Sequence, residues 1–284
     1  MTKPIYFFFT AWLLLLTACA GIKKETGYYR ISQTVSADSV VKLKSNLSHA
    51  INNDLFESFI FTGNNHITIP YRLLRPVKLG KADKYPLVLV LHSSGAIGTD
   101  NVSQLGVLAK LWAKPTTHKQ YPAYVVVPQF PQRSSNYYVD RDRNVLASVP
   151  APSLSQALQL IDSLKQVLPI NVKQIYVIGF SMGASSTVNS LGLRPDLFAA
   201  AVSVSGIPDF NYTDKLAQIP LWLIHGNADT ENPIPSDKQL YKELLSRHAQ
   251  HIKFWEIDHL NHDVYSELYT SDAIPAWLFG HKKK

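Results

Sequence analysis

The chain has 284 residues, of which 46% are hydrophobic and 17% are charged. A chain of this length and composition can bury a substantial core, which argues against disordered and fibrous classes and favours one α/β domain. The formal net charge of +7 is a mild excess. There is no dense stripe of Arg and Lys interleaved with aromatic residues, so no nucleic-acid partner is predicted.

The N-terminus is typical of an export signal. Lys3 precedes an apolar run from Ile5 to Leu16, which is shorter than the roughly 20 apolar residues that a membrane-spanning helix needs. Leu16-Thr17-Ala18-Cys19 resembles the bacterial lipobox, in which a signal peptidase cuts before the cysteine and the thiol carries a diacylglycerol. We therefore expect residues 1–18 to be removed and the protein to be a lipoprotein of the cell envelope, at the outer membrane facing the periplasm. An ordinary signal peptide and an uncleaved anchor are the alternatives.

Cys19 is the only cysteine of the chain. Its lipidation would leave the mature domain without a thiol, which excludes a cysteine nucleophile, thiolate zinc sites and disulfide chemistry.

Residues 19–54 are polar and mixed, and we interpret them as the lipidated cysteine and a tether with a short helix around Ser39 to Ile51. The catalytic domain is then expected over residues 55–281. From Glu57 to Pro76 apolar residues alternate with polar ones around the turn Gly63-Asn64-Asn65. This pattern predicts an antiparallel hairpin that leads into the sheet.

Six apolar runs follow, each of a length that suits a strand buried on both faces. They are Leu87–Leu91, Tyr124–Val127, Ile175–Ile178, Ala199–Val204, Leu221–Ile224 and Ile252–Ile257. The clearest helix lies between them, from Leu154 to Leu168, and Pro169 ends it. Strands that alternate with helices predict an α/β fold with a doubly wound, mostly parallel sheet.

Gly179-Phe180-Ser181-Met182-Gly183 matches the pattern G-x-S-x-G directly after one of these runs and before a helix of small residues, Ala184 to Leu193. This is the context of a nucleophile elbow, a strained strand-to-helix turn that exposes the serine hydroxyl at the edge of the sheet. The helix N-terminus favours negative charge that develops nearby. We therefore predict Ser181 as a catalytic nucleophile, and a bare loop is the alternative.

A serine hydroxyl needs a base, and the base needs a carboxylate to orient it. In hydrolases with this elbow the chain order is Ser, acid, His. Asp229 follows the run Leu221–Ile224 in a turn and is the predicted acid, with Asp209 as its rival. His259 and His262 both follow the last run and are the candidate bases. A His-x-x-His metal site is disfavoured because no third ligand lies nearby, so no metal or cofactor is predicted.

Two backbone amides are expected to stabilise the tetrahedral intermediate. The Met182 N–H is one, since it follows the nucleophile, and the Ser94 N–H in the loop after Leu87–Leu91 is the other. His92 begins that loop and is expected to brace it, whereas His225 is expected to make a structural hydrogen bond. The segment Gln129 to Pro152 is interpreted as a pocket loop, whose aromatic residues either stack on substrate or pack internally.

Residues 57–279 resemble the α/β-hydrolase group of predicted peptidases, which is related to feruloyl and acetylxylan esterases. The resemblance rests on sequence blocks spread along the domain, namely Leu73-Leu74-Arg75-Pro76, Lys84 to His92, Gly98-Thr99-Asp100-Asn101 with Gln104-Leu105, Pro128-Gln129, the elbow, Arg194 to Ala201 and the Asp229 turn. It implies the α/β-hydrolase fold. It also implies that the catalytic histidine is His262, because Asn261-His262-Asp263-Val264-Tyr265 fills the slot of the family's Gly-His-Asn-x-Trp.

Two departures from the family pattern concern glycines. The family's His-Gly at the oxyanion loop is His92-Ser93 here, and serine resists the positive φ that glycine can adopt, so a reshaped or strained loop is expected. The glycine before the catalytic histidine is Asn261, a residue that tolerates a left-handed backbone.

The leading hypothesis is a serine hydrolase that cleaves carboxylic esters, with acylated glycans among the candidate substrates. A peptidase or amidase of the same fold and a catalytically impaired, lipid-anchored binding protein are the alternatives.

Overall fold

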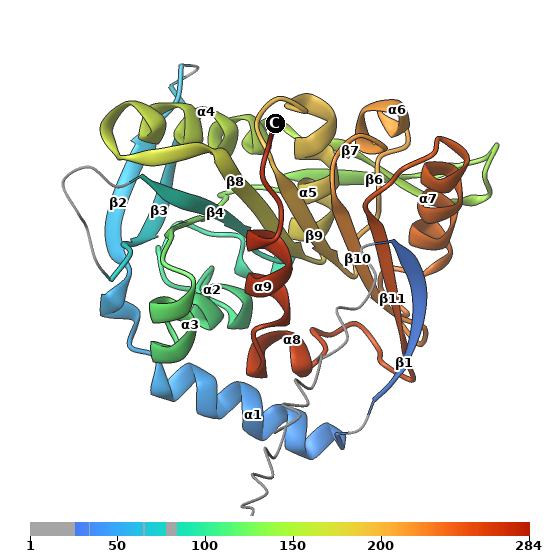
Figure 1. Cartoon of the computed structure of the whole chain (residues 1–284), viewed down its shortest axis with the longest axis horizontal. Coiled ribbons are helices and arrows are strands. Elements are labelled where there is room, and N and C mark those ends of the chain that lie inside the picture. The colour runs from blue at the N-terminus through green and yellow to red at the C-terminus, as the bar shows by residue number, and fades with distance from the viewer. Residues whose placement is uncertain (1–25, 34, 65, 78–83) are drawn as a thin grey trace, which may run out of the picture.

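The computed structural model describes residues 26–33, 35–64, 66–77 and 84–284. The predicted signal peptide and the predicted lipidation site Cys19 lie outside these residues. Within them, one nine-stranded sheet runs through the molecule (Figure 1). Its strands, in spatial order, are β1 (Gly27–Ser32), β11 (Ile252–Asp258), β10 (Leu221–Gly226), β9 (Ala200–Val204), β8 (Ile170–Phe180), β4 (Tyr85–Leu91), β5 (Tyr124–Pro128), β3 (Thr68–Leu74) and β2 (Glu57–Thr62).

In this spatial order, each strand from β1 through β11, β10, β9, β8 and β4 to β5 is parallel to the next. The last two pairs of the sheet, β5–β3 and β3–β2, are antiparallel. The predicted hairpin is therefore β2–β3, and the six predicted apolar runs form β4, β5 and β8 to β11. β4 and β5 are buried along their whole length, as expected for strands covered on both faces. The prediction of a doubly wound, mostly parallel sheet with an N-terminal antiparallel hairpin is confirmed.

Helices cover both faces of the sheet, and each face has its own hydrophobic core. On one face lie α4 (Pro152–Val167), α5 (Met182–Leu193), α6 (Thr213–Leu216) and α7 (Pro235–Ser246). On the other lie α1 (Ala37–Ala50), α2 (Val107–Lys110), α3 (Pro115–Gln120), α8 (Glu267–Thr270) and α9 (Ala273–Phe279) (Figure 1). Short 3₁₀ turns complete the described elements, namely η1 (Asn53–Leu55), η2 (Ser94–Ala96) and η3 (Leu111–Ala113). None of the helices in the described ranges is long and apolar enough to cross a membrane.

The segment expected to be a tether, residues 19–54, is joined to the rest of the fold where the structure describes it. β1 extends the sheet by pairing in parallel with β11, and Tyr29 lies opposite Trp255. α1 is attached as well, since the Lys110 ammonium donates to the Ser48 carbonyl at 2.8 Å and Lys44 forms an ion pair with Asp263. The sequence of β1 contains no apolar run because an edge strand with alternating burial covers only one face.

The segment between β5 and α4 is also more ordered than a pocket loop. It contains a second sheet, the antiparallel hairpin of β6 (Ser135–Asp140) and β7 (Val145–Pro150). Buried hydroxyls fix it to α5: the Ser186 Oγ lies 2.7 Å from the Ser134 Oγ and 2.8 Å from the Ser135 Oγ. Because these contacts are polar, the hairpin leaves no hydrophobic pattern in the sequence.

Candidate active site

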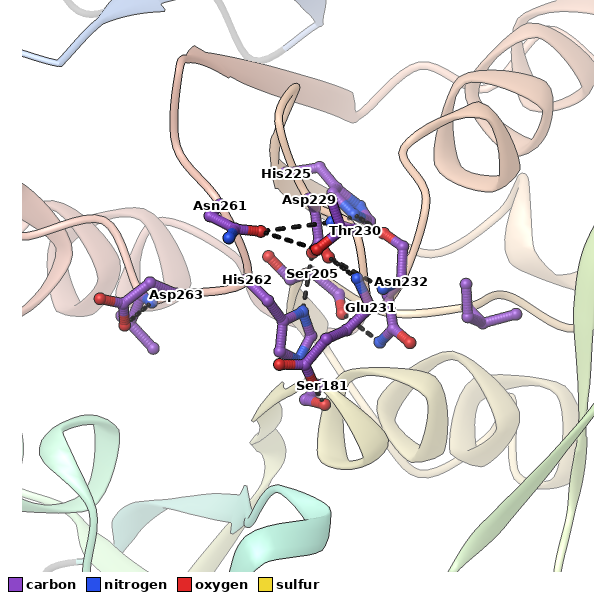
Figure 2. A network of polar contacts seen from close by, with 12 residues as sticks. Ser181, Ser205, His225, Asp229, Thr230, Glu231, Asn232, Asn261, His262 and Asp263 are labelled. Carbon is purple, nitrogen blue, oxygen red and sulfur yellow. Dashed lines mark hydrogen bonds and ion pairs between the residues drawn. The ribbon is translucent and has the colours of Figure 1, made fainter.

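Ser181 lies at a sharp turn between β8 and α5, at the lower end of the network in Figure 2. Its backbone has φ 57° and ψ −121°, a conformation that stores strain in a non-glycine residue. The turn depends on two close approaches. A Cβ atom on Gly179 would lie 2.2 Å from the Gly183 carbonyl oxygen, and one on Gly183 would lie 2.1 Å from the Leu91 carbonyl oxygen. Both glycines of the motif are therefore required by contact.

His262 lies in the loop after β11 and reaches the serine. Its Nε2 is 2.8 Å from the Ser181 Oγ, so the hydroxyl can donate to an unprotonated Nε2. The Phe180 ring packs beside the imidazole, with 5.0 Å between ring centroids, and this contact restricts the orientation of the ring.

Asp229 lies in the turn after β10 and orients His262 from behind. The His262 Nδ1 donates to the Asp229 Oδ2 at 2.7 Å, while the Asp229 Oδ1 accepts from the N–H groups of Glu231 at 3.0 Å and Asn232 at 2.8 Å. Burial raises the pKa of the Asp229 carboxyl, but hydrogen bonds from His225, His262 and Asn232 outweigh burial and hold this pKa well below its usual range. Asp229 is therefore a fixed, ionised acceptor.

Asp209, the alternative acid, and His259, the alternative base, form other hydrogen bonds. The Asp209 Oδ1 accepts from the backbone and side-chain N–H groups of Asn211, each at 2.8 Å. His259 donates its N–H to the Asn227 Oδ1 at 2.8 Å and has φ 59°. Within the described residues no three His, Asp or Glu side chains are grouped so that they could hold a metal ion.

The acid turn and the histidine loop are joined directly. The Asn261 Oδ1 accepts from the Thr230 N–H at 3.2 Å, and the Ala228 N–H donates to the Leu260 carbonyl at 3.1 Å. Asn261 does not use the left-handed backbone that asparagine tolerates, and His259 takes that conformation in this loop. Asn261 instead contributes a side-chain acceptor that glycine does not have.

The amides predicted for the oxyanion hole both begin a helical turn. Met182 is the first residue of α5 and Ser94 the first residue of η2, so neither N–H has an acceptor within its own helix. Ser94 and Ser181 line the same cavity. The expectation of strain at Ser93 is wrong: its φ of −72° and ψ of 167° are ordinary extended values.

His92 braces this loop, as expected. Its Nδ1 donates to the Ser93 carbonyl at 2.7 Å, and its Nε2 accepts from the Phe130 N–H at 2.9 Å. Burial lowers the pKa of His92 to about 4, so the imidazole is neutral at physiological pH and joins η2 to the segment after β5.

Known proteins resemble this chain in sequence and in fold. Residues 136–269 match the family described as Phospholipase/Carboxylesterase. A solved structure of a thermostable esterase is 28% identical and superposes with a TM-score of 0.73 over 81% of this chain and 64% of that one. The chain has the α/β-hydrolase fold.

Two further proteins that resemble this chain are named as esterases. A bifunctional acetylxylan esterase/xylanase of Neocallimastix patriciarum is 31% identical over 71 residues, which is 25% of this chain and 11% of that protein. A CE1 ferulic acid esterase of Anaeromyces mucronatus is 17% identical, covers 75% of this chain and 87% of its own, and has a TM-score of 0.53. The chain thus spans about a tenth of the curated relative and just under two thirds of the thermostable esterase.

A polar cavity of about 430 Å³ opens in front of Ser181. Its other lining residues are Ser94, Arg133, Asn136, Tyr137, Glu231 and Asn232. The Arg133 guanidinium lies 4.9 Å from the centre of the Tyr137 ring, and its Nε donates to the Ser135 carbonyl at 3.0 Å. A Glu231 carboxylate oxygen lies 3.7 Å from the His262 Nε2. The cavity therefore offers groups of both charges to a substrate.

The aromatic residues of the segment Gln129 to Pro152 divide between the two roles considered for them. Phe130 is fully buried and packs internally. Tyr137 lines the cavity, and its hydroxyl lies 3.0 Å from the Ser185 Oγ. Tyr138 is 41% exposed.

A second histidine lies behind the acid. The His225 Nδ1 is 2.8 Å from the Asp237 Oδ2, and its Nε2 is 2.7 Å from the Asn232 carbonyl and 3.3 Å from the Asp229 Oδ2 (Figure 2). The expected structural hydrogen bond of His225 is thus present. Sequence reasoning missed Asp237 and Asn232, because each joins the site through its position in the fold and neither belongs to a motif.

Proposed function

We propose that this α/β-hydrolase cleaves carboxylic esters through an acyl-enzyme. The observation that carries the proposal is the unbroken hydrogen-bonded chain from the Ser181 Oγ through His262 to Asp229, with steps of 2.8 and 2.7 Å. A chain of this kind converts a weakly nucleophilic hydroxyl into an attacking group.

In the first half-reaction Ser181 attacks the ester carbonyl carbon as His262 takes the hydroxyl proton. Asp229 holds the imidazole in the tautomer with a free Nε2 and stabilises the imidazolium that forms. The Met182 and Ser94 amides would donate to the negatively charged oxygen, and the positive end of α5 adds to this stabilisation. His262 then protonates the leaving alkoxide, and the alcohol departs.

In the second half-reaction water attacks the acyl group on Ser181. His262 takes a proton from this water and returns it to the Ser181 oxygen as the acid leaves. All proton transfers pass through one nitrogen, the His262 Nε2, so the cycle needs no second general acid or base.

For the substrate we propose an acyl group carried on a polysaccharide. Two relatives are named as an acetylxylan esterase and a ferulic acid esterase. The polar lining of the cavity and the half-buried Tyr137 ring suit hydroxyl-rich and planar groups.

Two measurements test the reaction. A fluorophosphonate probe should label the folded protein and the control Ser155→Ala, which replaces a serine on α4, but not Ser181→Ala. A panel of short acyl esters, feruloyl esters, acetylated glycans and peptide anilides should then give its highest kcat/KM with an ester. Absence of labelling in folded protein, or a preference for the anilides, would contradict the proposal.

We also propose that the enzyme is anchored to the cell envelope by a lipid on Cys19. The support is the sequence Leu16-Thr17-Ala18-Cys19 directly after an apolar run. Expression with labelled palmitate should label the wild-type protein and leave Cys19→Ser unlabelled. Equal labelling of both proteins would refute lipidation at this residue.

A further inference from the structure

We propose that His225 is a permanently protonated positioning residue that keeps the Asp229 carboxylate ionised and aimed at His262. The polar chain of the site then continues beyond the three residues of the triad, from Asp229 through His225 to Asp237. This inference rests on the proposed function, because it assigns His225 a part in the same reaction without contact with substrate.

The partners of the two ring nitrogens indicate the charge of His225. The Nε2 lies 2.7 Å from the Asn232 carbonyl oxygen, which can only accept, so this nitrogen carries a proton. The Nδ1 lies 2.8 Å from a carboxylate oxygen of Asp237, which accepts in its ionised form. Two donating nitrogens make an imidazolium.

The surroundings can support this charge. The His225 side chain is fully buried, and a buried cation is stable only when it is paired. Burial opposes its charge, but the carboxylates of Asp229 and Asp237 outweigh burial and raise the pKa of His225 to about 9. Burial also raises the pKa of Asp237, whereas its place in the first turn of α7 favours its ionised form.

The other charged neighbours pair with each other. Glu256, which lies beside His225 in the register of β10 and β11, has a carboxylate oxygen 2.8 Å from the Lys238 ammonium. The charges that face His225 directly are therefore those of Asp229 and Asp237.

The arrangement has a consequence for catalysis. The Asp229 Oδ2 that accepts from His262 is also 3.3 Å from the His225 Nε2, so one oxygen faces both imidazoles. A protonated His225 alone would cancel the charge that His262 needs when it becomes an imidazolium. Asp237 restores the balance, because the two carboxylates and one imidazolium of Asp229, His225 and Asp237 carry one net negative charge.

The charge of His225 is directly measurable by NMR of the protein labelled with ¹⁵N in its histidine rings. One histidine, identified by its absence in His225→Gln, should show both ring nitrogens protonated from pH 6 to 8. A single protonated nitrogen at pH 7, as in a neutral His225 that accepts from a protonated Asp237, would overturn the proposal. This measurement does not depend on activity.

Activity variants test the role. In His225→Gln the loss of a positive charge makes Asp229 harder to ionise and favours protonation of His262. Both effects move the acid limb of the kcat/KM profile to higher pH, by about half to one unit. Loosening of the acid should also lower kcat by up to about 100-fold. His118→Gln is the matched control. His118 is a histidine of α3, away from the site, and its Nε2 forms a part-buried contact with the Arg75 carbonyl.

Two further results decide the outcome. Asp237→Asn should leave His225 with a lower pKa in the NMR titration, whereas Asp237→Glu should restore part of it. A His225→Gln protein that folds and loses activity with an unmoved acid limb would reduce His225 to a packing role and refute the proposal. Failure of the proposed function would differ, because the wild-type protein would then not react with the fluorophosphonate.

Discussion

The oxyanion loop and the acid turn each begin with a buried histidine at the end of a parallel strand, yet the two histidines have opposite character. His92, directly after β4, donates to one backbone carbonyl and accepts from one backbone N–H. His225, at the end of β10, faces only acceptors, among them two carboxylates. Burial lowers the pKa of His92 to about 4, whereas the carboxylates around His225 raise its pKa to about 9 despite burial.

The difference follows from the partners, because residue type and place in the fold are the same. A backbone N–H aimed at a ring nitrogen requires that nitrogen to be unprotonated, while carbonyl and carboxylate oxygens require a proton. The oxyanion loop is thus held by neutral hydrogen bonds, and the acid turn by an ionic group behind Asp229. Substitutions in the two regions should therefore differ in size and in pH dependence.

The largest effect is expected in the acid turn, from Asp229→Asn. The amide can donate to the His262 Nδ1 and so favour the tautomer that cannot take the serine proton, which should lower kcat by about 10³- to 10⁴-fold. The measurement is steady-state hydrolysis of the best ester from the panel. Asp209→Asn is the matched control and should stay within about 10-fold; a larger loss there than in Asp229→Asn would make Asp209 the acid.

A smaller but substantial effect is expected in the oxyanion loop, from Ser94→Pro. Proline removes the N–H at this position. It is tolerated at the first position of a helical turn, and Ser93 already has the extended conformation that is required before proline. Loss of one oxyanion donor should lower kcat by about 10²- to 10³-fold with little change in KM. Ser94→Ala keeps the N–H and serves as the control. Equal kcat in both variants would exclude the Ser94 amide from the oxyanion hole.

Stability should depend on pH in opposite ways in the two regions. The pKa of His225 is raised on folding, so its contribution is fully present below pH 6.5 and is lost as pH rises through about 9. The pKa of His92 is lowered, so its contribution is present above pH 6.5 and is lost as pH falls through about 4. Each effect is on the order of 3 kcal/mol at most.

Denaturant unfolding of wild type, His225→Gln and His92→Gln from pH 4 to 10 measures this contrast. The stability advantage of wild type over His225→Gln should shrink toward alkaline pH, and its advantage over His92→Gln should shrink toward acid pH. Two differences that change with pH in the same direction would break the comparison between the loops.

The strands and the three residues of the hydrogen-bonded chain, Ser181, His262 and Asp229, were predictable from the sequence. Each central strand is an apolar run, since both of its faces are buried, and the glycines around Ser181 are required by backbone contacts within the elbow itself. Asp229 and His262 followed from chain order and from the family resemblance.

The rest depends on contacts between distant segments. β1 is an edge strand with one partly buried face, and the β6–β7 hairpin is held to α5 by serine hydroxyls, so neither produces an apolar pattern. Asp237 meets His225 only because α7 packs beside β10. Polar pairing of this kind has no periodicity that a single sequence can display.

The smallest effect is expected from Ser93→Gly, which tests how the oxyanion loop tolerates a residue that departs from the family pattern. At φ −72° serine is unstrained, so glycine relieves nothing and only adds freedom to the unfolded chain. We expect kcat/KM within about twofold of wild type and a loss of stability of about 0.5–1 kcal/mol. Steady-state kinetics and denaturant unfolding measure the two quantities. A tenfold or larger gain in turnover would show that serine restrains the oxyanion loop, and neutral bracing by His92 would then not suffice to shape it.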